Sequence, residues 1–227
     1  MKTLLHIQAS PRLARSHSRK LSSFFLDEWL KRHPDTSVAL RDLRTFPVPH
    51  VDEDWIAAAF TPPDERTAYM DNSLELSDLL VDESLSADIY LLGIPFYNFG
   101  MPSVVKAYVD NIVRINRTFL FTPEDTQAPY KSLVKHKLMF VVVSSGDTGY
   151  AESGELYASN HLEPHLRTAF GFIGIEDISF FYAGNDEFGG LKLEQSLRDA
   201  RRRIVEFIEA TTLEKAPKNV KPAAECA

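Results

Sequence analysis

Apolar segments of strand length alternate with helix-length amphipathic segments along nearly the whole chain. Residues 89–94 and 138–143 carry no charged side chain. Such continuous apolar runs are typical of central strands that are buried on both faces of a parallel sheet. Parallel strands need a crossover connection, usually a helix, and a helical pattern follows each of these two runs. The sequence therefore predicts an α/β fold, a doubly wound parallel sheet with helices on both faces.

The expected strands number five, and the first of them is expected near the middle of the sheet. This arrangement gives the strand order 2-1-3-4-5, which is flavodoxin-like. The strands are expected at residues 3–7, 38–43, 89–94, 138–143 and 178–182.

Helical periodicity predicts the segments that connect the strands. Gly171 and Gly174 are expected to end the helix before the fifth strand, and residues 118–122 are expected to begin an excursion off the main fold. We predict one domain over residues 1–210 and a disordered tail over residues 211–227. Helices are expected after residue 18 and over residues 55–60, 66–85, 103–115, 156–170 and 191–210.

Charge and cysteine content exclude several classes of function. The net charge of −7 argues against non-specific nucleic-acid binding. The only cysteine is Cys226, so one chain cannot form a disulfide, a thiol redox pair or a zinc–thiolate site, and this fits a cytoplasmic location. No apolar stretch approaches the roughly 20 residues that a transmembrane helix needs. We therefore expect no nucleic-acid partner and no membrane partner.

The loop after the first strand is rich in hydroxyl groups and ends at a helix start. A helix N-terminus presents free N–H groups and partial positive charge to an anion, so this loop indicates a phosphate site. Helix capping by serine is the alternative. The loop has neither the G-x-G-x-x-G pattern nor the P-loop lysine. The candidate residues are Ser10, Ser16, His17 and Ser18.

The loops after the third and fourth strands are expected to meet the first loop at the same edge of the sheet. The third-strand loop is bracketed by prolines and offers flat aromatic faces and one amide, which suit a planar heterocycle; an aromatic plug of the core is the alternative. The fourth-strand loop offers small residues and backbone N–H groups, although it could be a simple turn. The candidates are Phe96, Tyr97, Asn98 and Phe99 in one loop and Ser144, Ser145, Gly146 and Asp147 in the other.

Two further patterns have simpler explanations. His161 and His165 have a spacing that can bind metal, but Pro164 interrupts it and no third ligand is apparent, so we expect surface histidines and no metal. The arginines of residues 198–203 fit a solvated helix face with acidic partners. No acid–base dyad and no G-x-S-x-G elbow is evident.

Together the three loops resemble those of the flavodoxin-like FMN-dependent NAD(P)H:quinone reductases and azoreductases of bacteria. The Pro-aromatic-Tyr-Asn-Phe sequence at residues 95–99 is the specific motif, and residues 170–175 resemble a second family segment. The resemblance covers nearly the whole chain. It implies FMN held non-covalently, with NADH or NADPH as co-substrate and a quinone or azo compound as acceptor in a ping-pong reaction. It implies no catalytic side chain, because the hydride chemistry takes place at flavin N5.

The resemblance also assigns roles to the candidate residues. Ser10, Ser16, His17 and Ser18 would hold the phosphate, residues 96–99 would line the isoalloxazine ring, and residues 144–147 would complete its polar edge. It implies a homodimer in which residues 50–65 and 117–130 shape the partner's pocket.

The chain departs from the family pattern at three places. Phe96 stands where relatives often have Met, His17 where they have Gln, and residues 145–147 where they have Arg-Gly-Gly. We expect Asp147 to place a carboxylate near the ring or the substrate mouth. The alternatives are a flavodoxin-type electron carrier and a flavin-free protein that uses the aromatic loop to dock partners.

Overall fold

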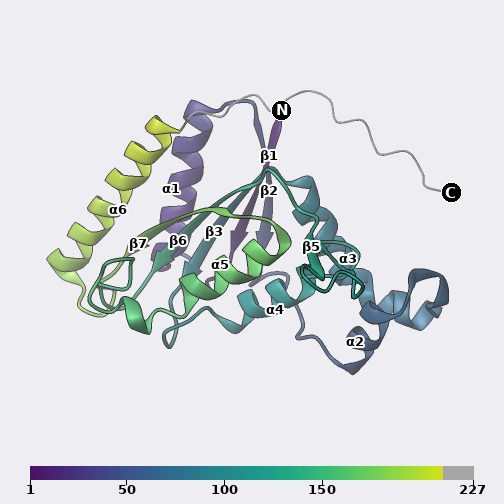
Figure 1. Ribbon diagram of the computed structural model, residues 1–227. Helices are drawn as coiled ribbons and strands as arrows, with labels where there is room; N and C mark the ends of the chain where they lie inside the picture. Colours follow the sequence, from purple (N-terminus) through teal and green to yellow (C-terminus); the bar gives the residue numbers. More distant parts are fainter. Residues whose placement is uncertain (212–227) are drawn as a thin grey trace.

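The computed structural model describes residues 1–211. Five parallel strands form one sheet in the order β2-β1-β3-β6-β7, which is 2-1-3-4-5 when the sheet strands alone are counted (Figure 1). The predicted order is therefore confirmed. The strands are β1 Lys2–Gln8, β2 Thr36–Asp42, β3 Ile89–Pro95, β6 Leu138–Ser144 and β7 Asp177–Ala183.

Helices cover both faces of the sheet, as predicted. Helices α1 and α6 share one buried cluster with the sheet, and α3, α4 and α5 share another (Figure 1). The short helix α2 packs against α3. The helices are α1 His17–Arg32, α2 Glu53–Phe60, α3 Ala68–Ser86, α4 Ser103–Ile112, α5 Leu162–Ile173 and α6 Gly190–Ala210.

The two clusters follow from the alternation of side chains along each strand. Leu4 and Leu91 belong to the cluster with α1 and α6, whereas Leu5 and Leu92 belong to the cluster with α3, α4 and α5. Every residue of β3 is buried, as the apolar run predicted. Burial on both faces fixes β3 at the centre of the sheet, and the loop that follows it therefore lies between the loops of its neighbours.

Gly93 allows helix α1 to lie close to the middle of strand β3. A Cβ atom at this position would lie 2.5 Å from Ser22 Oγ and 3.2 Å from the carbonyl oxygen of Ser18. Both residues belong to the buried side of α1. The glycine therefore sets the distance between the sheet and the N-terminal half of α1, which carries part of the predicted phosphate site.

The predicted start of α5 was wrong. Residues 157–159 form a 3-10 turn, and α5 begins only at Leu162. The Oδ1 atom of Asn160 accepts hydrogen bonds from the N–H groups of Leu162 and Glu163 at 3.0 and 3.1 Å, and so satisfies the first turn of a new helix. Gly171 lies inside α5, while Gly174 ends it with φ of 108°.

Other boundaries differ from the prediction by two or three residues: β2 begins at Thr36, α3 at Ala68, and α4 ends at Ile112. The expected excursion is an antiparallel hairpin of β4 Phe119–Phe121 and β5 Tyr130–Ser132, separate from the main sheet. The disordered tail predicted over residues 211–227 lies outside the described residues from residue 212 onward. Within residues 1–211, no helix has the length and apolar character needed to cross a membrane.

Candidate binding site

A cavity of about 320 Å³ lies at the carboxyl edge of the sheet, where the loops after β1, β3 and β6 meet. Its volume falls at the lower end of the range for small-molecule sites. Of the predicted site residues, Ser18, Phe99 and Asp147 do not line it. The predicted residues that do line it are Ser10, Ser16, His17, Phe96, Tyr97, Asn98, Ser144, Ser145 and Gly146.

The serine-rich end of the pocket is the N-terminus of α1. Ser16 caps the helix by accepting a hydrogen bond from the Arg19 N–H at 3.2 Å, and its Oγ lies 3.2 Å from that of Ser18. The capping alternative is thus observed for Ser16, although Ser16 also lines the cavity. The remaining N–H groups of the first turn have no partner within the helix. This end of the pocket therefore suits an anion.

The aromatic end of the pocket is a tight turn closed by two hydrogen bonds between Tyr97 and Gly100, of 3.0 and 2.9 Å. Its two central residues have positive φ, 47° at Asn98 and 66° at Phe99, as a type I′ turn requires. Asparagine adopts such angles readily, whereas they strain phenylalanine. The Phe99 side chain is exposed. The turn therefore holds an aromatic ring at the surface at a conformational cost.

We expect Phe99→Gly to raise the free energy of unfolding by about 1 kcal/mol, because glycine relieves the positive-φ strain. Phe99→Ala is the control, since it removes the ring but keeps the strained conformation. Urea unfolding of the three proteins measures the effect, and a Phe99→Gly variant no more stable than Phe99→Ala would show that the turn is relaxed.

Only Phe96 in this turn region packs into the core. Its ring lies 4.6 Å from that of Tyr150, between centroids, and touches the cluster of α3, α4 and α5. Tyr97 and Phe99 are exposed. The alternative of an aromatic core plug therefore applies to Phe96 alone.

The loop after β7 supplies pocket residues that the sequence analysis did not select. Asp186 and Glu187 line the cavity, as does Arg12 of the first loop. Asp186 accepts from Arg12 Nη1 at 3.0 Å and lies 3.2 Å from His17 Nε2. A carboxylate from one edge of the sheet thus pairs with two side chains of the candidate phosphate loop. The signal was present in the sequence, because polar residues follow the fifth strand directly.

The carboxylates of the cavity are those of Asp186 and Glu187 rather than that of Asp147. The Asp147 carboxylate accepts the Thr148 N–H at 2.7 Å within its own loop. Gly146 lies against Glu187, because a Cβ at Gly146 would overlap the Glu187 carboxylate. A side chain at residue 146 would therefore compete with Glu187 for space at the pocket wall.

His17 has an unused polar atom at the pocket. Its buried Nδ1 has no hydrogen-bond partner among residues 1–211, while Nε2 lies 3.2 Å from a carboxylate oxygen of Asp186. This unpartnered atom, the serine hydroxyls and the free N–H groups form a donor set that fits a phosphate group.

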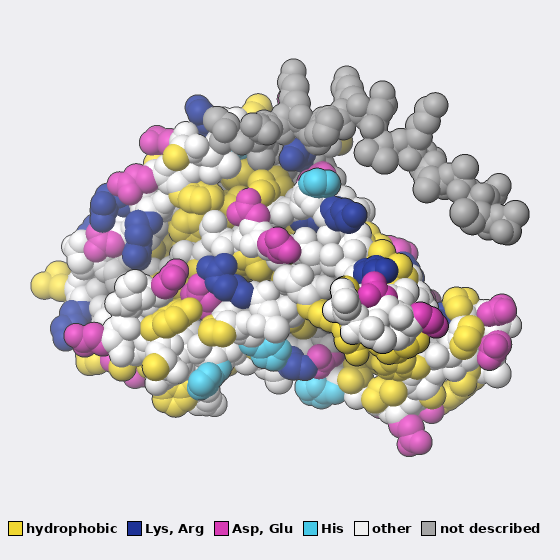
Figure 2. Space-filling model, in the orientation of Figure 1, with side chains coloured by type: hydrophobic (Ala, Val, Ile, Leu, Met, Phe, Trp, Pro, Cys, Tyr) yellow, Lys and Arg dark blue, Asp and Glu magenta, His cyan; other side chains and the backbone are white. Residues whose placement is uncertain are grey.

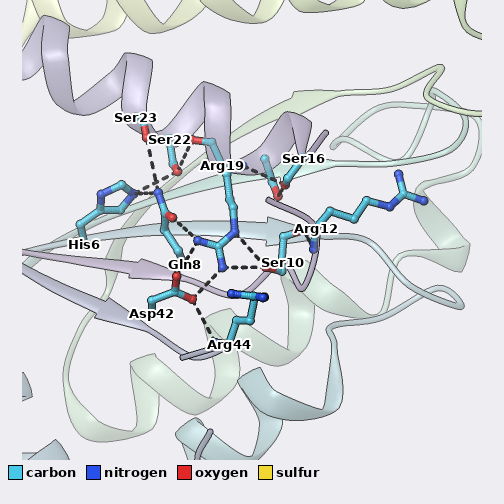
Figure 3. Close-up of polar contacts among 11 residues, drawn as sticks. His6, Gln8, Ser10, Arg12, Ser16, Arg19, Ser22, Ser23, Asp42 and Arg44 are labelled. Atoms are coloured by element: carbon cyan, nitrogen blue, oxygen red, sulfur yellow. Dashed lines mark hydrogen bonds and ion pairs between the residues drawn. The ribbon is translucent and has the colours of Figure 1, made fainter. Parts of the chain in front are cut away.

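A polar cluster lies directly behind Ser10 (Figure 3). The Arg19 guanidinium donates to the Ser10 carbonyl and forms an ion pair with Asp42. His6 lies beside this cluster, with its Nε2 3.0 Å from Ser22 Oγ. Burial, reinforced by the positive charge of Arg19, lowers the pKa of His6 to about 4 although Asp42 opposes the shift. His6 is therefore neutral at pH 7.

A larger groove of about 820 Å³ lies between the loop after β6 and α6, and it shares only Ser145 with the smaller cavity. Its α6 wall carries Arg198, Arg202 and Arg203 of the basic run. Arg198 and Arg202 pair with acidic side chains of the same helix. The smaller cavity is the better candidate because three strand-end loops converge on it.

His161 and His165 are exposed, and residues 1–211 hold no cluster of His, Cys, Asp or Glu suited to a metal ion.

The fold is that of a flavodoxin-like protein, and a family model described as flavodoxin-like fold matches residues 2–208. The chain is 46% identical over 208 residues to the FMN-dependent NADH:quinone oxidoreductase of Nostoc punctiforme, covering 92% of this chain and 98% of that protein. It is 41% identical over 206 residues to the FMN-dependent NAD(P)H:quinone oxidoreductase 1 of Pseudomonas aeruginosa, covering 90% and 97%. The chain belongs to this family, as its three loops predicted.

Solved structures agree on the fold. The azoreductase from Bacillus anthracis strain Sterne superposes with a TM-score of 0.82 at 22% identity, covering 93% of this chain and all of that one. An FMN-dependent NADH-azoreductase from the Ames Ancestor strain, solved in complex with FMN, gives a TM-score of 0.79 at 24% identity, covering 92% and 98%.

Proposed function

We propose that the chain binds FMN in the 320 Å³ cavity, takes hydride from NADH or NADPH and passes it to quinones or azo compounds. One observation carries this proposal: hydrogen-bond donors that suit a phosphate group and an aromatic turn line the same cavity. The names of its relatives, FMN-dependent quinone oxidoreductases, support the same chemistry. Co-substrate and acceptor would use the same place in turn, which gives ping-pong kinetics.

The pocket residues would bind and orient the cofactor. Bound FMN supplies both the hydride acceptor and the hydride donor of the reaction. Ser10, Ser16, His17 and the first turn of α1 would hold the phosphate. Phe96, Tyr97 and Asn98 would contact the ring, and backbone N–H groups of the loop after β6 would favour negative charge on its polar edge.

Spectroscopy and kinetics test this proposal. The purified protein should be yellow, or should quench FMN fluorescence on titration, and it should consume NADH steadily when a quinone is present. Mixing with NADH in the absence of a quinone should bleach the flavin absorbance in a single reduction, without further NADH consumption. Flavin binding without steady NADH consumption would favour an electron carrier, and a colourless protein that leaves FMN unquenched would favour a flavin-free binding protein.

We expect Asn98→Ala to weaken FMN binding by about tenfold and to slow turnover, because the variant loses the amide at the ring and an αL-tolerant residue. Asn98→Gly separates these causes, since it keeps the backbone conformation and loses only the amide. Fluorescence titration of both variants measures the effect. Full flavin occupancy with an unchanged rate in Asn98→Ala would contradict the assignment.

The homodimer is also a proposal, supported by apolar surface in the two segments named from the sequence. Figure 2 shows hydrophobic side chains gathered around the β4–β5 hairpin and α2. Ile56 and Phe60 of α2 and Phe121 and Tyr130 of the hairpin are exposed. Sedimentation equilibrium would test the association.

A cytoplasmic location and a single domain over residues 1–210 stay predictions.

A further inference from the structure

The Arg19 guanidinium uses its full set of hydrogen-bond donors inside the protein. Its Nε and Nη2 donate to the Ser10 carbonyl at 2.8 and 2.6 Å. Nη2 and Nη1 donate to the two carboxylate oxygens of Asp42 at 2.6 and 2.9 Å, and Nη1 also donates to Gln8 Oε1. Arginine carries five N–H donors in a rigid plane, and all five are occupied here. Lysine, a point charge with three donors, cannot reproduce this set.

Arg19 connects the two ends of the loop after β1. Its backbone N–H is bound by the Ser16 cap in the first turn of α1, while its side chain returns to the start of the same loop at Ser10 (Figure 3). Both Ser10 and Ser16 line the cavity, but Arg19 does not. One side chain outside the pocket therefore joins the two ends of the loop that the proposed function assigns to the flavin phosphate.

Asp42, at the end of strand β2, holds the Arg19 guanidinium in place. Only 10% of the Arg19 side chain and 18% of the Asp42 side chain are exposed. Burial alone would raise the pKa of Asp42, but hydrogen bonds from Arg19 and the Arg44 N–H, together with both positive charges, hold it below its usual value. The pair therefore stays ionised at neutral pH and the guanidinium stays oriented.

We propose that Arg19, oriented by Asp42, is a positioning residue that sets the spacing between Ser10 and the N-terminus of α1 for a phosphate group. The inference rests on the proposed function, since it concerns the phosphate half of the flavin site. It predicts a specific defect: variants of Arg19 lose the advantage of FMN over riboflavin, which has the same ring and no phosphate.

The experiment titrates the full chain, freed of flavin, with FMN and with riboflavin, following flavin fluorescence. The ratio of the riboflavin Kd to the FMN Kd measures the contribution of the phosphate. In Arg19→Lys and Arg19→Gln we expect this ratio to fall at least tenfold, with the riboflavin Kd changed less than threefold. Asp42→Asn is the second variant if an Arg19 variant fails to fold, and it should lower the ratio in the same direction.

Arg41→Gln is the matched control. Arg41 is also buried on β2 and forms a two-bond ion pair with Glu83 of α3, but it does not line the cavity. This variant should lose stability and keep the wild-type ratio. A wild-type ratio in the variants of Arg19 and Asp42, or an equal fall in Arg41→Gln, would overturn the inference alone. A wild-type chain that binds no FMN would overturn the proposed function and this inference with it.

Discussion

Replacing Gly93 by alanine should lower the free energy of unfolding by about 2 kcal/mol, the usual size of an overpacking penalty. The new Cβ would lie 2.5 Å from Ser22 Oγ, and this hydroxyl cannot easily turn away because it donates to the Arg19 carbonyl at 3.1 Å. Helix α1 would have to move away from β3. Since its first turn carries Ser16 and His17, FMN binding should weaken about tenfold as well. Urea unfolding and flavin titration measure the two effects.

Gly171→Ala is the control for this prediction. Gly171 lies within α5, and among residues 1–211 a Cβ there would meet no atom within 4 Å outside its own stretch of helix backbone. Alanine in a helix interior is favoured over glycine by about 1 kcal/mol, so the same chemical change should stabilise the protein at this position. Equal stability effects in the two variants would show that the sheet and α1 are not held at the distance described.

Acid should destabilise the protein through His6. Its pKa is about 4 in the folded protein against 6.5 in the unfolded chain, so the unfolded state binds the proton more tightly. The contribution of His6 to stability is therefore full above pH 6.5, falls as the pH drops and is lost below about pH 4. Between pH 7.5 and 5.0 the loss should be about 2 kcal/mol, at 1.36 kcal/mol for each pH unit below 6.5.

The measurement compares wild type and His6→Gln by urea unfolding at pH 7.5 and at pH 5.0. The difference in free energy of unfolding between the two proteins should shift by about 2 kcal/mol in favour of the variant at the lower pH. A constant difference would mean that His6 titrates alike in both states. Because a charged His6 would repel Arg19, flavin release on acidification should also be reduced in the variant.

The order of the sheet could be predicted because physical constraints on parallel strands leave few choices. The uninterrupted apolar runs of β3 and β6 required burial on both faces, and helical segments between the strands required crossovers. The start of α5 could not be predicted from periodicity, because residues 157–159 also fit a helix and the side chain of Asn160 decides where the new helix begins.

Pocket residues could be predicted from the sequence where they lie in a loop that follows a strand. Residues that support the pocket from other elements could not. Ser10, Asn98 and Ser144 could be selected by their positions after strands. Asp186 follows the same rule, because it lies in the loop after the last strand. Arg19 and Asp42 obey no local rule. Arg19 reaches both the Ser10 carbonyl and the Asp42 carboxylate only because α1 and β2 pack beside β1.

The ion pair of Asp186 with Arg12 bears on how the cofactor is loaded. A positively charged binding site that is open to solvent attracts salt anions, and its affinity for a charged ligand falls steeply as ionic strength rises. Here the Asp186 carboxylate already balances the positive charge of Arg12. The site therefore presents little net positive charge to salt anions, and FMN retention should depend only weakly on salt.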